Sequence, residues 1–406
     1  MSDRTKKIIF AVVFIILSFA IAIGLYIFFF QPLVNPTPTP SGQPPLGSLP
    51  PTPGGSPQPG VPTPTPGAFP EATPGEQTPG TQTSSATTLL RDGVTQSLTS
   101  AANGQGARFY NPEDGRFYRV NPDGTITALG EKQFFNVKSV SWAHRNDNAI
   151  IEFPDGNNVY YDFTAKRQVT LPKHWEDFTF SPDDSHMAAK SIGLDPGNRF
   201  LIVANADGNE AQAVATLGQN GDKTLVNWSP NNQVIAFAKT GRPQAEGAEE
   251  VYIIGEHQEN FKSLIVPGRG FLPNWSPNGQ HLIYSVYHER DGLRPSLWVT
   301  GANGDTSEGR RGLNLNTWAD KCAWESENSL ICGVPQSLDT GAGLNRDTFS
   351  DIPDDLYRVD LTNGVSIKIS TSDQNHPIKF PVLSSDKRQL MFTDAVTGRL
   401  YRYDLH

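Results

Sequence analysis

The sequence predicts an all-β protein built as a β-propeller, and three observations support this fold class. A short element that joins an aromatic residue to Ser-Pro occurs at 227–232 and returns forty-seven residues later at 274–279. An apolar, alternating run follows each copy, which is the pattern of a buried strand. Long amphipathic helices are missing from the region of the repeats, and strand-only repeats of this length are typical of propeller blades.

The recurring element predicts an inner strand, a tight turn and a buried strand. In the copy that starts at Trp228, Pro230 presets φ at the second turn position and Asn231 suits the third. Asn232, or Gly279 in the next copy, tolerates the left-handed conformation that closes a hairpin. The aromatic position before the turn holds Trp142, Phe180, Trp228, Trp275 and Trp324. Because these rings recur at one position, we expect them to pack between blades rather than to form a ligand-stacking cage.

The repeats predict seven blades, with six or eight as the alternatives. Residues 87–406 divided by seven give about 46 residues per blade, and six blades would give about 53. The last unit stops after its third strand, at Tyr401–Asp404, so we expect its fourth strand to come from elsewhere. We predict that residues 87–91 supply this strand and close the ring.

The N-terminal part of the chain predicts a membrane anchor. Residues 8–30 are almost continuously apolar, and as a helix they would span roughly 34 Å, enough for the hydrocarbon core. Arg4, Lys6 and Lys7 precede this run, so residues 1–7 are expected in the cytoplasm and the rest outside it. A cleaved signal peptide is the alternative, but the apolar run exceeds a signal h-region and no Ala-x-Ala site follows it.

Residues 31–86 predict a disordered linker between this anchor and the propeller. Seventeen of the 33 prolines lie between Pro32 and Pro79, among Thr, Gly, Ser and Gln. Such a segment favours polyproline II and cannot bury enough apolar area to fold. The domain organisation predicted from the sequence is therefore a tail (1–7), a transmembrane helix (8–30), a linker (31–86) and a β-propeller (87–406).

Charge and motifs limit the partners and the chemistry. The net charge is −9, and the region from residue 87 onward carries 30 basic and 39 acidic residues. This balance argues against nucleic acid and against anionic lipid surfaces, which select a basic face. The chain has no Gly-x-Ser-x-Gly elbow, no phosphate-binding glycine loop and no His-Glu-x-x-His motif. The sequence therefore predicts no catalytic residue and no cofactor.

The repeats resemble those of a known family. The Trp-Ser-Pro-Asn-Gly element at 275–279, the apolar strand after it and the third strand that closes on Asp-Gly or Asn-Gly are similar to the WD40-like (PD40) repeats of TolB-like propellers. The N-terminal propeller of dipeptidyl peptidase IV-like proteins is also similar. The resemblance covers most of 100–406, is specific at Trp228 and Trp275, and is loose at Trp142, Trp324 and Leu383. It implies a binding or scaffolding module and supplies no catalytic residues, because no α/β-hydrolase domain accompanies the propeller.

Long loops between the second and third strands of units three to six are the predicted binding elements, since loops on a rigid scaffold usually carry binding. The longest, 334–354, together with Asp355 directly after it, carries five charged residues that we take as candidate ligand contacts: Arg346, Asp347, Asp351, Asp354 and Asp355. Their oxygens would suit a structural Ca²⁺, but the spacing matches no calcium loop, so solvated loop charge is the preferred interpretation.

The two cysteines predict a disulfide. Cys322 and Cys332 flank a turn near Glu327, so a hairpin centred there places them opposite each other or nearly so. The predicted location outside the cytoplasm favours the disulfide, with two packed free thiols as the alternative.

Two functions fit these observations. The first is a membrane-anchored, extracytoplasmic, non-catalytic module that binds or scaffolds a protein or glycan of the cell envelope. The alternative is an enzyme, such as a lyase, a lactonase or a glycan hydrolase, with its site in the propeller channel. An enzyme would need carboxylates or histidines that converge from the inner strands. The residues predicted there are Trp, Phe, Ala, Asn, Ser and Leu, which favours the first function.

Overall fold

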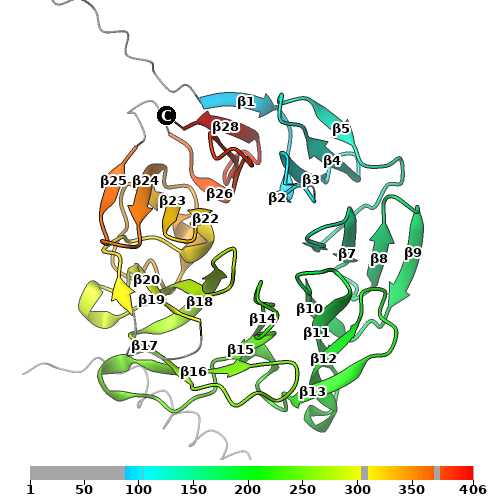
Figure 1. Cartoon of the computed structure of the whole chain (residues 1–406), viewed down its shortest axis with the longest axis horizontal. Helices are drawn as coiled ribbons and strands as arrows, with labels where there is room; N and C mark the ends of the chain where they lie inside the picture. The colour runs from blue at the N-terminus through cyan, green and yellow to red at the C-terminus, as the bar shows by residue number, and fades with distance from the viewer. Residues whose placement is uncertain (1–86, 103, 303–309, 370–374, 406) are drawn as a thin grey trace, which may run out of the picture. The chain divides into compact units, whose positions relative to one another are not determined.

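The computed structural model describes residues 87–102, 104–302, 310–369 and 375–405. Their strands form seven four-stranded sheets, and the first strand of each blade lies nearest the common axis (Figure 1). The prediction of a seven-bladed, all-β propeller is therefore confirmed. The predicted tail, membrane span and linker lie outside the described residues. Within the described residues, no helix has the length and apolar character that crossing a membrane requires.

In blades 1 to 6 the strands run in chain order from the inner to the outer edge. Blades 1 to 3 comprise β2 (Gln96–Ser100), β3 (Ala107–Asn111), β4 (Arg116–Val120) and β5 (Ile126–Ala128); β6 (Ser139–Trp142), β7 (Asn148–Glu152), β8 (Asn158–Asp162) and β9 (Arg167–Leu171); β10 (Trp175–Phe180), β11 (His186–Ile192), β12 (Arg199–Asn205) and β13 (Gln212–Thr216). Blades 4 to 6 comprise β14 (Thr224–Val226), β15 (Ala236–Ala238), β16 (Glu249–Ile254) and β17 (Leu264–Val266); β18 (Arg269–Trp275), β19 (His281–Tyr287), β20 (Pro295–Gly301) and β21 (Arg311–Gly312); β22 (Cys322–Ser326), β23 (Ser329–Pro335), β24 (Asp354–Asp360) and β25 (Ser366–Lys368). Blade 7 comprises β26 (Ile378–Leu383), β27 (Gln389–Asp394), β28 (Leu400–Asp404) and, at its outer edge, β1 (Thr87–Arg91).

The ring closes through the first and last strands of the described chain. β1 pairs antiparallel with β28, with Thr87 opposite Tyr403 and Leu89 opposite Tyr401. Figure 1 shows β1 along the outer side of β28. The predicted closing strand is thus confirmed, and β28 gains a partner for an edge that would otherwise be open.

A single turn design recurs between the first and second strands. In blade 3, the Ser181 hydroxyl donates to Asp183 (2.6 Å) and accepts from the backbone N–H of His186 (3.0 Å). The same pair of bonds occurs in the turns that begin at Ser276 and Ser384. The residue that closes the turn is left-handed in each of four blades, at Asp184, Asn232, Gly279 and Lys387. The predicted left-handed position is therefore confirmed.

The core lies between neighbouring blades. The Trp275 ring of blade 5 stacks on the Phe237 ring of blade 4, with 5.4 Å between ring centres. Phe180, Trp228 and Trp275 are buried, as expected for packing between blades, whereas Trp142 and Trp324 are only half-buried.

The boundaries of some elements differ from those predicted. The inner strand of blade 4 ends at Val226, two residues before Trp228. β2, the inner strand of blade 1, was not predicted, because no Trp-Ser-Pro element follows it. The longest loop is 336–353, since β23 continues to Pro335 and β24 already begins at Asp354.

Cys322 and Cys332 lie opposite each other in β22 and β23 and form a disulfide in the structure. Both residues are buried. The bond therefore ties the two innermost strands of blade 6 together at the level of the core.

Candidate binding face

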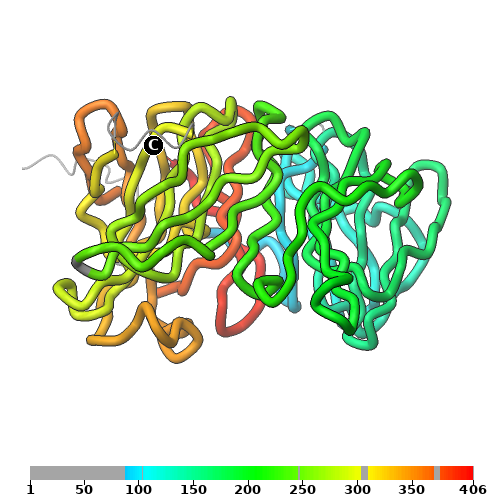
Figure 2. Tube along the Cα trace, turned by 90° about the horizontal axis from the view of Figure 1, so that it is seen from below, coloured from blue at the N-terminus to red at the C-terminus, as the bar shows by residue number. Residues whose placement is uncertain are grey.

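The long loops gather on one face of the propeller. Neighbouring strands of a blade run in opposite directions, so the second strand of every blade ends on the same face of the ring. The loops that join second strands to third strands therefore share that face. In blades 3 to 6 these loops are longer than in the other blades, with six residues in blade 3 and eighteen in blade 6. We call them together the loop rim: residues 193–198, 239–248, 288–294 and 336–353. The corresponding connections in blades 7, 1 and 2 are hairpins of four or five residues. Figure 2 shows loop 336–353, in orange, projecting from the lower side of the ring.

Two loops of the rim are joined by hydrogen bonds. The Gly341 N–H donates to the Gly292 carbonyl (2.8 Å), and Arg294 Nε donates to the Leu338 carbonyl (2.7 Å). Gly343 lies so close to Tyr287 that an added Cβ would come within 2.4 Å of the tyrosine Cβ. The loops of blades 5 and 6 therefore form one continuous ledge.

The residues of the longest loop that were predicted to contact a ligand lie in different environments. The Arg346 guanidinium lies over the Trp318 ring, 4.9 Å from its centre, and donates to Asp320 (2.7 Å). This stacking anchors the loop to blade 6. Asp347 and Asp351, in contrast, are exposed.

The other two predicted residues, Asp354 and Asp355, begin strand β24 and point to opposite sides. Asp354 has no exposed surface, pairs with Lys321 Nζ (2.6 Å) and accepts the backbone N–H of Ile378 (2.6 Å). Burial raises the pKa of Asp354, and the Lys321 ammonium opposes this rise. Asp355 instead pairs with Lys368 at 2.7 Å. The five predicted residues therefore do not converge on one point, and the described part of the chain contains no group of three metal-ligating side chains.

Exposed apolar side chains are spread over this face. Leu194 is 102% exposed and Leu344 is 60% exposed, both on the loop rim. Val396, on the short hairpin of blade 7, is 64% exposed. Phe380 adds a partly exposed ring on the inner strand of the same blade.

Inner strands of four blades carry a bulge near their loop-rim end. The residues with positive φ at these bulges are Ser97, Asp177, Gly270 and Phe380, in blades 1, 3, 5 and 7. A bulge redirects side chains, and positive φ in a bulky residue such as Phe380 stores strain. The bulges therefore interrupt the pairing of these inner strands near the loop rim.

A groove of about 410 Å³ runs along the inner strands of blades 1 and 2. Ser97, Trp142, His144 and Phe380 line it, together with Arg108. The Trp142 indole donates to the Ser97 carbonyl (2.9 Å), and the Arg108 guanidinium covers its ring. Trp142 thus differs from the buried tryptophans, because it borders this groove.

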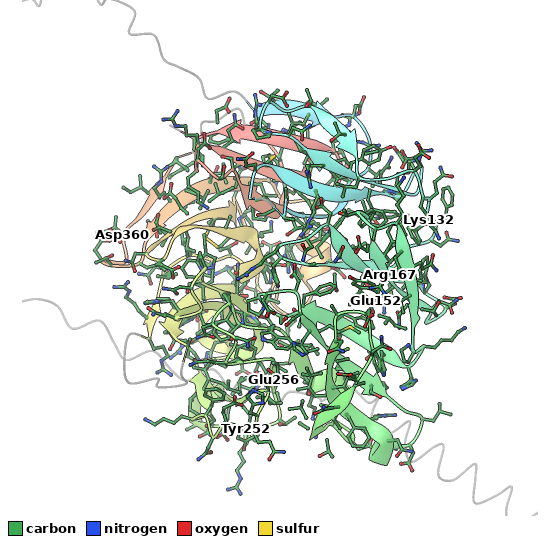
Figure 3. The ribbon with its side chains drawn as sticks, turned by 45° about the vertical axis from the view of Figure 1, so that its right-hand side comes forward. Lys132, Glu152, Arg167, Tyr252, Glu256 and Asp360 are labelled. Atoms are coloured by element: carbon green, nitrogen blue, oxygen red, sulfur yellow. A yellow bond between two sulfur atoms is a disulfide. The ribbon has the colours of Figure 1, made fainter. Side chains whose placement is uncertain are left out.

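Charged groups meet beside the bulge at Asp177. The Asp177 carboxylate pairs with Lys190 of β11, a lysine that is only 4% exposed. The Asp177 amide donates to Glu152, which is buried at the end of β7 (Figure 3). Burial raises the pKa of Glu152. These residues were not predicted from the sequence, although a lysine inside the apolar run 187–192 and a glutamate after Ile150-Ile151 are visible signals.

Comparison with solved structures shows the propeller fold. An oligogalacturonate lyase in complex with manganese matches 79% of this chain and 93% of its own, at 15% identity and a TM-score of 0.50. The β-propeller domain of Cps50 (Swd1) from Myceliophteria thermophila matches 79% of this chain and its own whole length, at 10% identity and a TM-score of 0.52. TolB from Acinetobacter baumannii matches 52% of each chain, at 16% identity and a TM-score of 0.39. No known protein family and no curated protein matches the sequence, so the resemblance to TolB-like and dipeptidyl peptidase IV-like repeats remains a prediction.

Proposed function

We propose that the chain is a membrane-anchored, extracytoplasmic binding module whose loop rim holds a protein of the cell envelope. The apolar run 8–30 supports the anchor, and the Pro-rich segment 31–86 supports a spacer between membrane and propeller. The disulfide between Cys322 and Cys332 supports a location outside the cytoplasm, where such bonds persist.

One observation carries the binding function: long loops and exposed apolar side chains share a face. Single exposed apolar residues are ordinary on protein surfaces. Here Leu194, Leu344 and Val396 lie on loops of one face, around inner strands whose bulges expose Phe380. Apolar anchors within a polar surround are what protein interfaces present.

Photo-crosslinking in intact cells tests this proposal. A photoreactive amino acid at Leu344 of the full-length chain is expected to give a discrete adduct with one partner. Ile367, on the outer strand β25, is the matched control, because it is 61% exposed while Leu344 is 60% exposed. The same substitution at Ile367 is expected to give no such adduct.

The adduct also distinguishes a protein from a glycan partner. If the partner is a protein, protease digestion degrades the adduct. The adduct should also disappear when Leu194 and Phe380 are both replaced by Ser. The same adduct from position 367, or none from positions 194 and 344, would refute binding at the loop rim. An adduct that withstands protease but shifts with glycan-degrading enzymes would assign the rim to a glycan instead.

An enzyme with its site in the channel is the second candidate, and one observation favours it. Glu152 has a raised pKa and lies beside Asp177, which pairs with Lys190. A carboxyl with a raised pKa beside a second carboxyl is an arrangement that general acid–base catalysis uses. This reading requires Glu152 to reach a substrate, although the residue is 5% exposed.

A further inference from the structure

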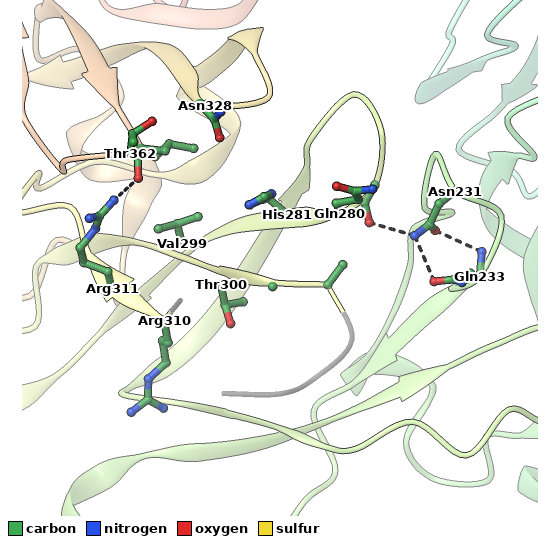
Figure 4. Close-up of a pocket in the computed structure, with 14 residues that line it drawn as sticks. Asn231, Gln233, Gln280, His281, Val299, Thr300, Arg310, Arg311, Asn328 and Thr362 are labelled. Carbon is green, nitrogen blue, oxygen red and sulfur yellow. Dashed lines mark hydrogen bonds between the residues drawn. The ribbon is translucent and has the colours of Figure 1, made fainter. Parts of the chain in front are cut away.

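Two hollows in the propeller differ in how completely the structure describes their walls. The larger, of about 780 Å³, lies among the turns of blades 4 to 6, and its described lining breaks off between Ala302 and Arg310 (Figure 4). The groove of about 410 Å³ beside Trp142 is lined by strands β2, β3, β6 and β26 and by the turn after β6. The undescribed residue nearest in the chain to this lining is Asn103, which carries no charge. The described side chains therefore define the chemistry of the groove.

Two residues with a strained backbone line this groove. Ser97 has φ 52 and Phe380 has φ 53, and each lies at the bulge of an inner strand. Left-handed residues other than glycine cost energy, and they gather at functional sites. Gly270 takes the equivalent position at the bulge of blade 5, so the bulge itself needs no side chain. Phe380 therefore keeps a strained aromatic residue where glycine would suffice.

The Phe380 ring is accessible rather than part of the core. It is 37% exposed, and the Lys379 ammonium lies 4.9 Å from its centre. The half-buried side chains of Val140 and Trp142 add apolar surface to the same lining, and the Ser97 carbonyl holds the Trp142 indole in place. The groove therefore offers a ligand a fixed apolar and aromatic wall.

Hydroxyl groups form the other part of the lining. Ser97 and Thr99 are half-buried, and Ser100 is exposed. Among the described residues, their three hydroxyl groups have no hydrogen-bond partner. Each of them can therefore donate a hydrogen bond to a ligand and accept one from it.

The one permanently charged residue in the described lining is already engaged. Arg108 donates to the Asn146 carbonyl (2.7 Å), to Asp147 (3.2 Å) and to the Ala143 carbonyl, and it is only 1% exposed. The described lining therefore has no free charge with which to select an ionised ligand.

We propose that this groove binds a neutral sugar, with its C–H face on the Phe380 ring and its hydroxyl groups bonded to Ser97, Thr99 and Ser100. A sugar ring presents an apolar face and a hydroxyl-bearing edge, which match the two parts of the lining. The volume falls within the range of small-molecule sites, roughly 300–1,000 Å³. The inference goes beyond the protein binding proposed for the loop rim, and Phe380 is the residue named for both surfaces.

Calorimetric titration of the full-length protein, in a detergent without a sugar headgroup, tests the proposal. The neutral probes are cellobiose, maltose and N,N′-diacetylchitobiose; cellobiouronic acid is the matched acidic sugar, and trialanine represents a peptide. Saturable binding is expected for at least one neutral disaccharide, with the acidic sugar and the peptide each at least tenfold weaker. No saturable binding of any neutral probe, or equal or tighter binding of the acidic sugar or the peptide, would overturn the proposal.

A matched pair of variants locates the sugar. Thr99→Val removes one hydroxyl group from the groove and keeps the shape of the side chain. Thr179→Val is the control, because Thr179 follows the bulge of blade 3 as Thr99 follows that of blade 1, is also half-buried and does not line the groove. Thr99→Val should weaken binding about threefold, as loss of one neutral hydrogen bond predicts, and Thr179→Val should leave it unchanged. Equal affinities of the two variants would show that the sugar does not bind in the groove.

Phe380→Gly removes the ring and relieves the strain at once, since glycine adopts positive φ freely. The variant is expected to fold, as the bulge with Gly270 does, and to bind the sugar at least tenfold more weakly. Leu344→Ser, on the loop rim, should keep full sugar binding even if it loses the protein partner. Unchanged affinity in Phe380→Gly would overturn the contact with this ring, and loss of sugar binding in Leu344→Ser would assign the sugar to the loop rim instead of the groove.

Discussion

Glu152 is a residue whose burial opposes ionisation. It is buried, and burial raises its pKa. Ser139, which donates a hydrogen bond at 2.9 Å, Lys138 and the Asp177 amide favour the charged form, while the Asp177 carboxylate opposes it. A carboxyl whose pKa is higher in the folded state contributes stability below its unfolded pKa. That contribution is lost as the pH rises through the folded value. At neutral pH, the charged Glu152 therefore costs stability.

Replacing Glu152 by Gln should raise the free energy of unfolding at pH 7 and change it little at pH 4. Each unit by which burial raises the pKa corresponds to about 1.4 kcal/mol. Gln keeps an oxygen that can accept from Ser139 but carries no charge. Urea unfolding from pH 4 to 8 measures the difference. An exposed carboxylate, in Glu289→Gln, is the control and should leave the pH profile unchanged. A Glu152→Gln protein that is less stable by the same amount at every pH would contradict this account.

At the scale of the element, the repeated turn offers a matched comparison. Ser181 and Ser384 make the same two side-chain hydrogen bonds, but Ser181 is 1% exposed and Ser384 is half-buried. Ser181→Ala leaves the backbone N–H of His186 without its side-chain acceptor where water has less access, and should destabilise the protein by about 1–3 kcal/mol. Ser384→Ala should cost less, because water can replace the lost hydroxyl. Chemical denaturation compares the two, and an equal cost would mean that burial does not set the strength of the turn.

Elements whose chemistry is local could be predicted, and those set by tertiary contacts could not. The turn at Ser276 is specified by its own residues, so its left-handed Gly279 was foreseen. The strand at Gln96 lacks such a signature, and only pairing with β3 defines it. Asp354 and Asp355 look equivalent in sequence, yet alternation along β24 sends one inward to Lys321 and the other outward to Lys368. Nothing in the local sequence marks where that strand begins.

The candidate surfaces divide in the same way. The long loops of blades 3 to 6 were visible as long gaps between predicted strands, so the loop rim could be foreseen. The bulges at Asp177 and Phe380 depend on a register shift between two strands, which no residue pattern announced. The groove beside Trp142 needs the inner strands of blades 1 and 2 and Phe380 of blade 7, which lie far apart in the sequence. Sites assembled from several blades therefore become visible only with the fold.

At the scale of the whole molecule, ring closure depends on five residues that are far in sequence from the other strands of their blade. β1 covers the outer edge of β28, although more than three hundred residues separate the two strands. Pairing between such distant segments forms late and at a high entropic cost, so the closed ring rests on the contacts made by a short strand. Without β1, the edge of β28 would offer unpaired backbone groups to other chains.

Deleting residues 87–91 should therefore open the ring without removing any core strand. We expect a lower melting temperature and concentration-dependent association through the free edge of β28. Deleting 62–66, which are also five residues but lie in the predicted linker, is the control and should change neither property. Differential scanning calorimetry gives the melting temperature, and light scattering on a sizing column gives the mass. If the two deletion variants have the same melting temperature and both stay monomeric, the contacts between blades 7 and 1 already close the ring without β1.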